Sequence, residues 1–183
     1  MKTWLKPIKR MRACEEAIAW GENYETLEEA WAKCERGDWM LWLCGRLSGE
    51  PESDSRKKLV LAACECARLS LPYVREGEER PLKTIETAEQ YARGGNNITL
   101  TMVRDAAAAA YAAADAASVS AYAADAAYAA YAAADAAYAA AYAYAAAAAA
   151  RTTALEQCAD IVRKHYPVAP VNKEGGIKWN IQQ

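Results

Sequence analysis

The sequence predicts an all-α protein, a compact multi-helix bundle that includes a long alanine- and tyrosine-rich helical hairpin. Apolar residues recur at helical spacing through residues 7–93, and residues typical of helix caps stand between the apolar segments. Residues 106–150 are almost wholly alanine, the best helix former. We expect a single helical domain over 1–167, with short helices within 7–93 and long alanine-rich helices within 99–166. The remaining residues, 168–183, should form an irregular tail.

Two helices are expected near the amino terminus. Pro7 suits the first turn of an amphipathic helix, and Gly21 should end that helix. Thr26 and Glu29 have the spacing of a capping box, in which the Thr hydroxyl accepts a hydrogen bond from the Glu amide. A second helix should therefore run from Thr26 to Arg36.

The third expected helix is the most apolar of the short ones. Gly37 should stop the preceding helix, and Asp38 should cap the next one. Residues 39–44 are too apolar for an exposed element, so they should form a buried helix that ends near Ser48.

Two further helices follow. Asp54 or Ser55 can cap a largely buried helix over 59–71. Pro81 then stands near the start of a fifth helix. Gly94 should end that helix, because glycine is common directly after the last helical residue.

The alanine-rich segment raises a geometric question. From Thr99, which can cap a sixth helix, no Gly or Pro occurs until Pro167. One straight helix over 99–166 would extend about 100 Å, whereas a compact domain of this length spans roughly 40 Å. The segment should therefore turn back on itself, and the helix-weakening residues 118–120 are where we place the turn.

Composition limits the classes of function. The formal net charge is −2, which lacks the basic excess of a nucleic-acid-binding protein. Aspartates interrupt the alanine-rich segment, and alanine contributes little to membrane insertion, so no membrane span is expected. No apolar run of signal-peptide length follows the basic amino terminus, which favours the cytoplasm. The six cysteines should then be reduced and mostly buried.

The sequence contains no motif for catalysis. His165 is the single histidine, so no histidine-based dyad or triad can form. Phosphate loops, nucleophile elbows and zinc-binding motifs do not occur. We therefore expect no enzymatic activity, no metal and no cofactor.

One segment has the composition of a recognition site. Trp39, Trp42 and Arg46 are spaced three and four apart, so two indoles and a guanidinium share a helical face that could stack on a flat or anionic ligand. The alternative is that both indoles belong to the core. Further arginines could add to a cationic cleft. The candidate residues for binding a ligand or partner are Arg36, Asp38, Trp39, Trp42, Arg46, Arg68, Arg75 and Arg163.

Four segments resemble a known family: residues 36–43 (RGDWMLWL), 63–68 (ACECAR), 85–89 (IETAE) and 158–163 (CADIVR). Together with the alanine-rich stretch, they are similar to the immunity proteins that occur beside bacterial toxins and in phage genomes. The resemblance covers roughly residues 10–167. It implies a helical protein that neutralises a toxin or defence effector by binding, without catalysis.

Three functions are thus open at this point. The first is an immunity or anti-defence protein that binds one toxin or defence effector protein. The second is a phage-type sponge that sequesters a phosphate-bearing nucleotide signal in a pocket of Trp, Tyr and Arg. The third is a structural homo-oligomer assembled through alanine-lined faces. A cavity at the face of Trp39, Trp42 and Arg46 would favour the second function over the first.

Overall fold

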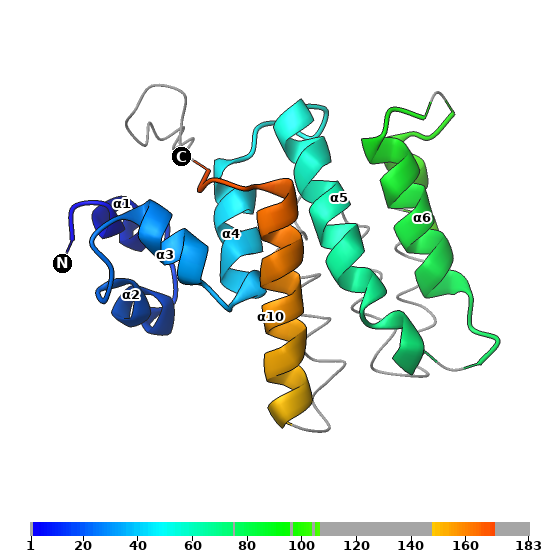
Figure 1. Cartoon of the computed structure of the whole chain (residues 1–183). Helices are drawn as coiled ribbons and strands as arrows, with labels where there is room; N and C mark the ends of the chain where they lie inside the picture. Colours follow the sequence, from blue (N-terminus) through cyan, green and yellow to red (C-terminus); the bar gives the residue numbers. More distant parts are fainter. Residues whose placement is uncertain (1, 75, 96, 104, 107–147, 171–183) are drawn as a thin grey trace.

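A computed structural model describes residues 2–74, 76–95, 97–103, 105–106 and 148–170. All regular secondary structure in these residues is helical, which confirms the predicted all-α class for them (Figure 1). The predicted hairpin and its turn at 118–120 lie outside the described residues. The single domain predicted over 1–167 stays a prediction. Of the predicted tail only 168–170 is described, and it is not helical.

The amino-terminal segment forms two helices, so the prediction of one helix from Pro7 to Gly21 is wrong. Helix α1 spans Leu5–Arg10 and α2 spans Glu15–Gly21. Between them Arg12 has a φ of 66°, a left-handed conformation that no Gly announces in the sequence. In a single helix, positions 5 and 21 would be about 24 Å apart. The break instead folds α1 onto α2, so that a Cβ on Gly21 would meet Leu5 Cδ2 at 2.8 Å.

Helix α3 spans Leu27–Lys33 and begins as predicted. The amide of Glu29 donates to Thr26 Oγ1 at 3.1 Å. The Glu29 carboxylate turns back as well, although it accepts from the amide of Glu25, at 3.2 Å, instead of that of Thr26. The helix ends three residues before the predicted Arg36 because the backbone is already extended at Cys34.

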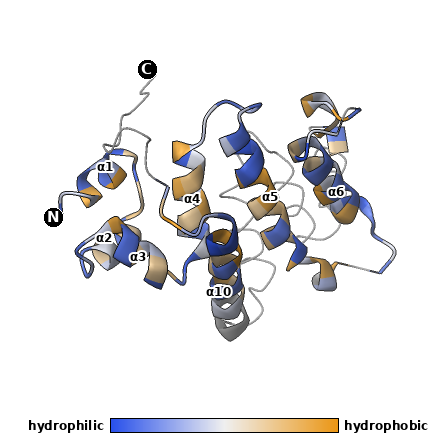
Figure 2. Cartoon of the chain, turned by 45° about the horizontal axis from the view of Figure 1, so that its top comes forward, coloured by the Kyte–Doolittle hydropathy of each residue, from blue (hydrophilic) through white to orange (hydrophobic). Residues whose placement is uncertain are grey.

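Helix α4 spans Gly37–Leu47, and the predicted roles of its first residues are wrong. Gly37 is the first helical residue and not a terminator. Asp38 does not cap the helix; its carboxylate binds the side chain of Arg36. The end of the helix at Leu47, just before Ser48, agrees with the prediction. Figure 2 shows hydrophobic residues along α4, which lies between α3 and α5.

Helix α5 spans Asp54–Arg68 and α6 spans Arg80–Ala92. The cap of α5 is Ser53, whose hydroxyl accepts from the amide of Arg56 at 3.2 Å, and not the predicted Asp54 or Ser55. A short 3-10 turn, η1 (Leu71–Tyr73), follows α5. Gly94 ends α6 with a φ of 77°, as predicted. The predicted cap Thr99 is also present, because its hydroxyl accepts from the amide of Met102 at 3.2 Å.

Helix α10 spans Ala148–His165 and packs against both α4 and α5 (Figure 1). Among residues 152–165 of this helix, the buried positions follow helical spacing and are Ala154, Leu155, Cys158, Ala159 and Val162. The closest approach to α4 is at Gly37, where an added Cβ would lie 2.4 Å from the Cys158 Cβ and 2.6 Å from the Ala159 amide nitrogen. Gly37 is therefore needed for two helices to pack with their backbones in near contact.

We predict that Gly37→Ala destabilises the fold. The new methyl group has no space between α4 and α10, and overpacking of this kind costs about 1–3 kcal/mol. The matched control is Gly45→Ala in the same helix, where the nearest atom, Leu59 Cδ2, would lie 3.8 Å from the new Cβ. Thermal unfolding followed by circular dichroism should show a Tm lowered by several degrees for Gly37→Ala only. Equal Tm values for the two variants would contradict this packing.

A tryptophan-lined cavity as the candidate functional site

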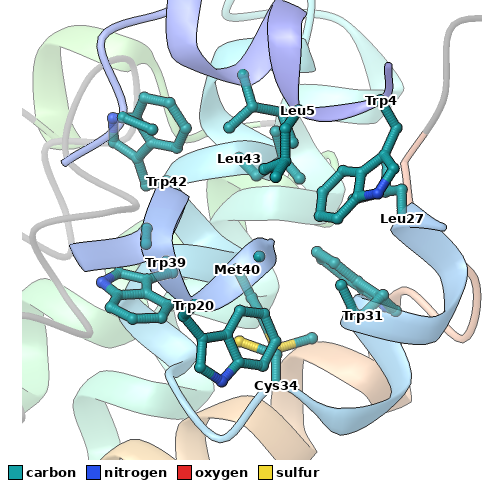
Figure 3. A pocket seen from close by; sticks show the side chains of 15 residues that line it. Trp4, Leu5, Trp20, Leu27, Trp31, Cys34, Trp39, Met40, Trp42 and Leu43 are labelled. Carbon is teal, nitrogen blue, oxygen red and sulfur yellow. The ribbon is translucent and has the colours of Figure 1, made fainter. Parts of the chain in front are cut away.

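Helices α1 to α4 line an open cavity of about 70 Å³ near the amino terminus. Its walls contain five of the six tryptophans of the chain, drawn from α2, α3 and α4 and from the turn before α1 (Figure 3). They are Trp4, Trp20, Trp31, Trp39 and Trp42. Aliphatic side chains, alanines, Gly21, Cys34 and Met40 complete the lining, and no charged side chain takes part. The cavity is therefore suited to an apolar group.

The cavity has a buried floor and a partly exposed rim. Trp31 is only 4% exposed and lies against the core. The other four indoles are half-buried, so their edges face solvent. An apolar group could enter on that side and contact aromatic faces, which offer a large contact area at a small cost in side-chain entropy.

Hydrogen bonds and ring contacts hold the indoles in place. Trp4 Nε1 donates to the carbonyl of Tyr24 at 3.3 Å, and Trp31 Nε1 donates to the carbonyl of Tyr166 at 3.0 Å. Trp20 and Trp39 meet at a tilted angle with 5.8 Å between ring centroids. Because their polar atoms are bound to the backbone, Trp4 and Trp31 present apolar surface to the cavity.

Arg36 and Asp38, two of the predicted binding residues, are bound to each other beside the cavity. The guanidinium donates twice to the Asp38 carboxylate, at 2.9 and 2.7 Å, and once to Glu16 at 3.1 Å. The hydrogen bonds to Asp38 raise the pKa of Arg36 above its ordinary value. The same guanidinium lies 4.2 Å from the ring centroid of Trp39. The pair thus holds Trp39 in position.

Arg163 supports the cavity from behind. Its guanidinium donates to the carbonyl of Cys34 at 2.6 Å and to Asp160 at 2.7 Å. Cys34 follows the last turn of α3 and lines the cavity. A cation at the carboxyl end of a helix satisfies carbonyls that have no partner within that helix. Arg163 therefore joins α10 to the end of α3.

The other predicted arginines lie elsewhere. Arg68 donates to the Glu89 carboxylate at 2.9 and 3.0 Å and so joins α5 to α6. Arg46 is exposed on α4 and does not line the cavity. Arg75 lies outside the described residues. The structure thus brings Trp39 and Trp42 together in one cavity, but it does not gather the described arginines into a cationic cleft.

Sequence reasoning missed Trp4, Trp20 and Trp31. These residues lie on different elements, so no single helical period relates them to Trp39 and Trp42. A signal was nevertheless present, because five of the six tryptophans fall within the first 42 residues. Such a concentration of the largest apolar side chain indicates a shared aromatic site.

The cavity offers little reactive chemistry. Its one ionisable group is the thiol of Cys34, and burial raises the pKa of this thiol to about 11. His165 lies elsewhere and pairs with Glu65 at 2.8 Å. Within the described ranges, no three His, Cys, Asp or Glu side chains are close enough to hold a metal ion. The arrangement favours binding of apolar surface.

In the described part of the chain, no helix combines the length and apolar character required to cross a bilayer.

Comparisons with known proteins found no match: no protein-family model, no curated protein and no solved structure is similar to the chain.

We predict that iodoacetamide labels only Cys14 in the native protein. Cys14 is exposed, whereas the other five cysteines are buried. Burial raises the pKa of Cys34, Cys44 and Cys64, so these thiols stay protonated at neutral pH and are poor nucleophiles. Intact-mass analysis at pH 7.5 should show one added group, and six after denaturation in guanidinium chloride. Rapid native labelling of Cys34 would show that the cavity opens widely in solution.

Proposed function

We propose that this chain is a non-catalytic binding protein of the immunity type, which neutralises a toxin or defence effector by binding it. The observation that supports this proposal best is the cavity lined by five tryptophans and no charged side chain. Tryptophan is enriched among the residues that dominate binding energy at protein interfaces. The cavity would accept an apolar side chain of the partner at the centre of such an interface.

One buried anchor side chain would supply part of the binding free energy, and the surrounding surface would supply the rest. Full burial of a Leu or Ile side chain contributes about 1.5–3 kcal/mol. A stable interface usually buries about 800 Å² on each partner, so the surfaces of α1 and α2 around the cavity would also take part. In this proposal the cavity supplies the central contact, and the surrounding helices supply shape and charge complementarity.

The nucleotide sponge is less well supported. A pocket for a phosphate-bearing ligand needs cationic or hydrogen-bond donor groups that are free to meet the phosphates. Arg36, Arg68 and Arg163 each donate to a carboxylate of the same chain. Heat-denatured protein, purified from cells with active nucleotide signalling, should therefore release no nucleotide detectable by absorbance at 260 nm and mass spectrometry. A stoichiometric nucleotide would favour the sponge instead.

The homo-oligomer proposed from alanine-lined faces depends on residues outside the described ones, so it stays a prediction.

We predict that Ala17→Leu abolishes neutralisation. Ala17 lines the cavity from α2, and a leucine side chain there would occupy the space that the apolar side chain of the partner would fill. The assay is growth of a bacterial host that expresses, one at a time, the genes adjoining the gene for this chain, with the wild-type or variant chain co-expressed. Wild-type chain should restore growth, whereas Ala17→Leu should not.

The matched control is Ala19→Leu, which makes the same change on the exposed side of α2, away from the cavity. This variant should restore growth as the wild-type chain does. Circular dichroism of both variants confirms that they fold. Rescue by folded Ala17→Leu at the wild-type level would contradict a role for the cavity, and failure of the wild-type chain against every adjoining gene would contradict the immunity function.

A further inference from the structure

The charges around the cavity are separated by helix. Every ionisable side chain in residues 2–12 is basic, whereas residues 13–32 contain six glutamates and no Lys or Arg. The cavity lies between these two segments, because α1 provides Leu5 and Ile8 to its wall and α2 and α3 provide the opposite side. A partner that fills the cavity would therefore meet a basic helix on one side and an acidic pair of helices on the other.

Three of the six glutamates on the acidic side pair with a cation of the chain. Glu16 pairs with Arg36 at 3.1 Å, and Glu29 pairs with Lys33 at 3.3 Å. Glu25 pairs with Lys2. Carboxylates that already have a cationic partner attract a further cation only weakly.

Of the five cations on the basic side, Lys2 alone has a carboxylate partner among the described residues. Lys6, Lys9, Arg10 and Arg12 are all exposed, and none of them pairs with a carboxylate of the described residues. On α1, positions 5 and 8 face the cavity, while Lys6, Lys9 and Arg10 at spacings of three and four share another face of the same helix. A row of unpaired cations thus runs beside the apolar cavity.

We infer that the partner of this surface presents an aliphatic anchor side chain next to an acidic segment. This inference rests on the proposed function and specifies the chemistry of the partner. The anchor is Leu, Ile or Val, because a cavity of about 150 Å³ is enough for benzene and this one measures about 70 Å³. Asp or Glu residues within one or two helical turns of the anchor lie opposite Lys6, Lys9 and Arg10. Charges at such a rim mainly raise the association rate and set specificity.

The test uses phage-displayed random 16-residue peptides as the probe, selected on immobilised full-length chain at low ionic strength. The expected result is a set of enriched peptides that contain one Leu, Ile or Val anchor and at least two nearby acidic residues. These peptides should lose binding to Ala17→Leu and retain it with Ala19→Leu. Their affinity for wild-type chain should fall as salt is raised, because salt screens exposed charges.

A charge-reversed variant tests the contribution of the exposed cations on α1 independently of the cavity. The triple variant Lys6→Glu, Lys9→Glu, Arg10→Glu should bind the enriched peptides about tenfold more weakly, as expected for three partly exposed ion pairs. The control carries Lys57→Glu, Lys83→Glu and Arg93→Glu, which make the same change in net charge on α5, on α6 and directly after α6. It should bind as the wild-type chain does. Circular dichroism verifies the fold of both.

The outcomes distinguish this inference from the function on which it rests. Peptides that require the cavity but carry no acidic excess, or that bind the triple variant as tightly as the wild-type chain, would overturn the acidic partner and leave the immunity function standing. If no enriched peptide depends on the cavity, the aliphatic anchor is overturned as well. The immunity function itself is decided by the growth assay, which uses no peptide.

Discussion

The packing of α10 against α4 is the contact on which the rest of the structure depends. At Gly37 the two helices approach so closely that a single methyl group has no room. This approach places Arg163 beside the end of α3, where it binds the carbonyl of Cys34. The carbonyl of Tyr166 accepts from Trp31 in the same region. A helix more than one hundred residues away in the sequence thus fixes the back wall of the cavity.

Local chemistry predicted some of the helix boundaries but not those that depend on contacts between helices. Thr26 and Gly94 act through their own side chain or backbone, so their roles could be read from the sequence. The break at Arg12 could not, because no Gly or Pro marks it; it accompanies the packing of Leu5 onto Gly21. Gly37 was also interpreted wrongly, as a helix terminator. Its function is set by α10, a distant partner that a local pattern does not reveal.

The candidate site, too, could be predicted from the sequence only in part. Helical spacing placed Trp39 and Trp42 on a common face, and both line the cavity. Spacing could not show which carboxylate each arginine would meet. Arg36 binds Asp38 only two residues away, whereas Arg68 binds Glu89 on the next helix. An arginine beside tryptophans therefore indicates a ligand site only after the acidic neighbours in the fold are known.

An open apolar cavity lowers the stability of the chain that contains it. Its walls expose apolar surface to water that a filled core would bury, and each Å² left exposed forgoes about 25 cal/mol of hydrophobic stabilisation. One larger side chain at Ala17 or Ala30 would fill much of the cavity. The small alanines keep this space open while five indoles surround it. A partner side chain that fills the cavity would recover this free energy on binding, so the same void that weakens the free protein would strengthen the complex.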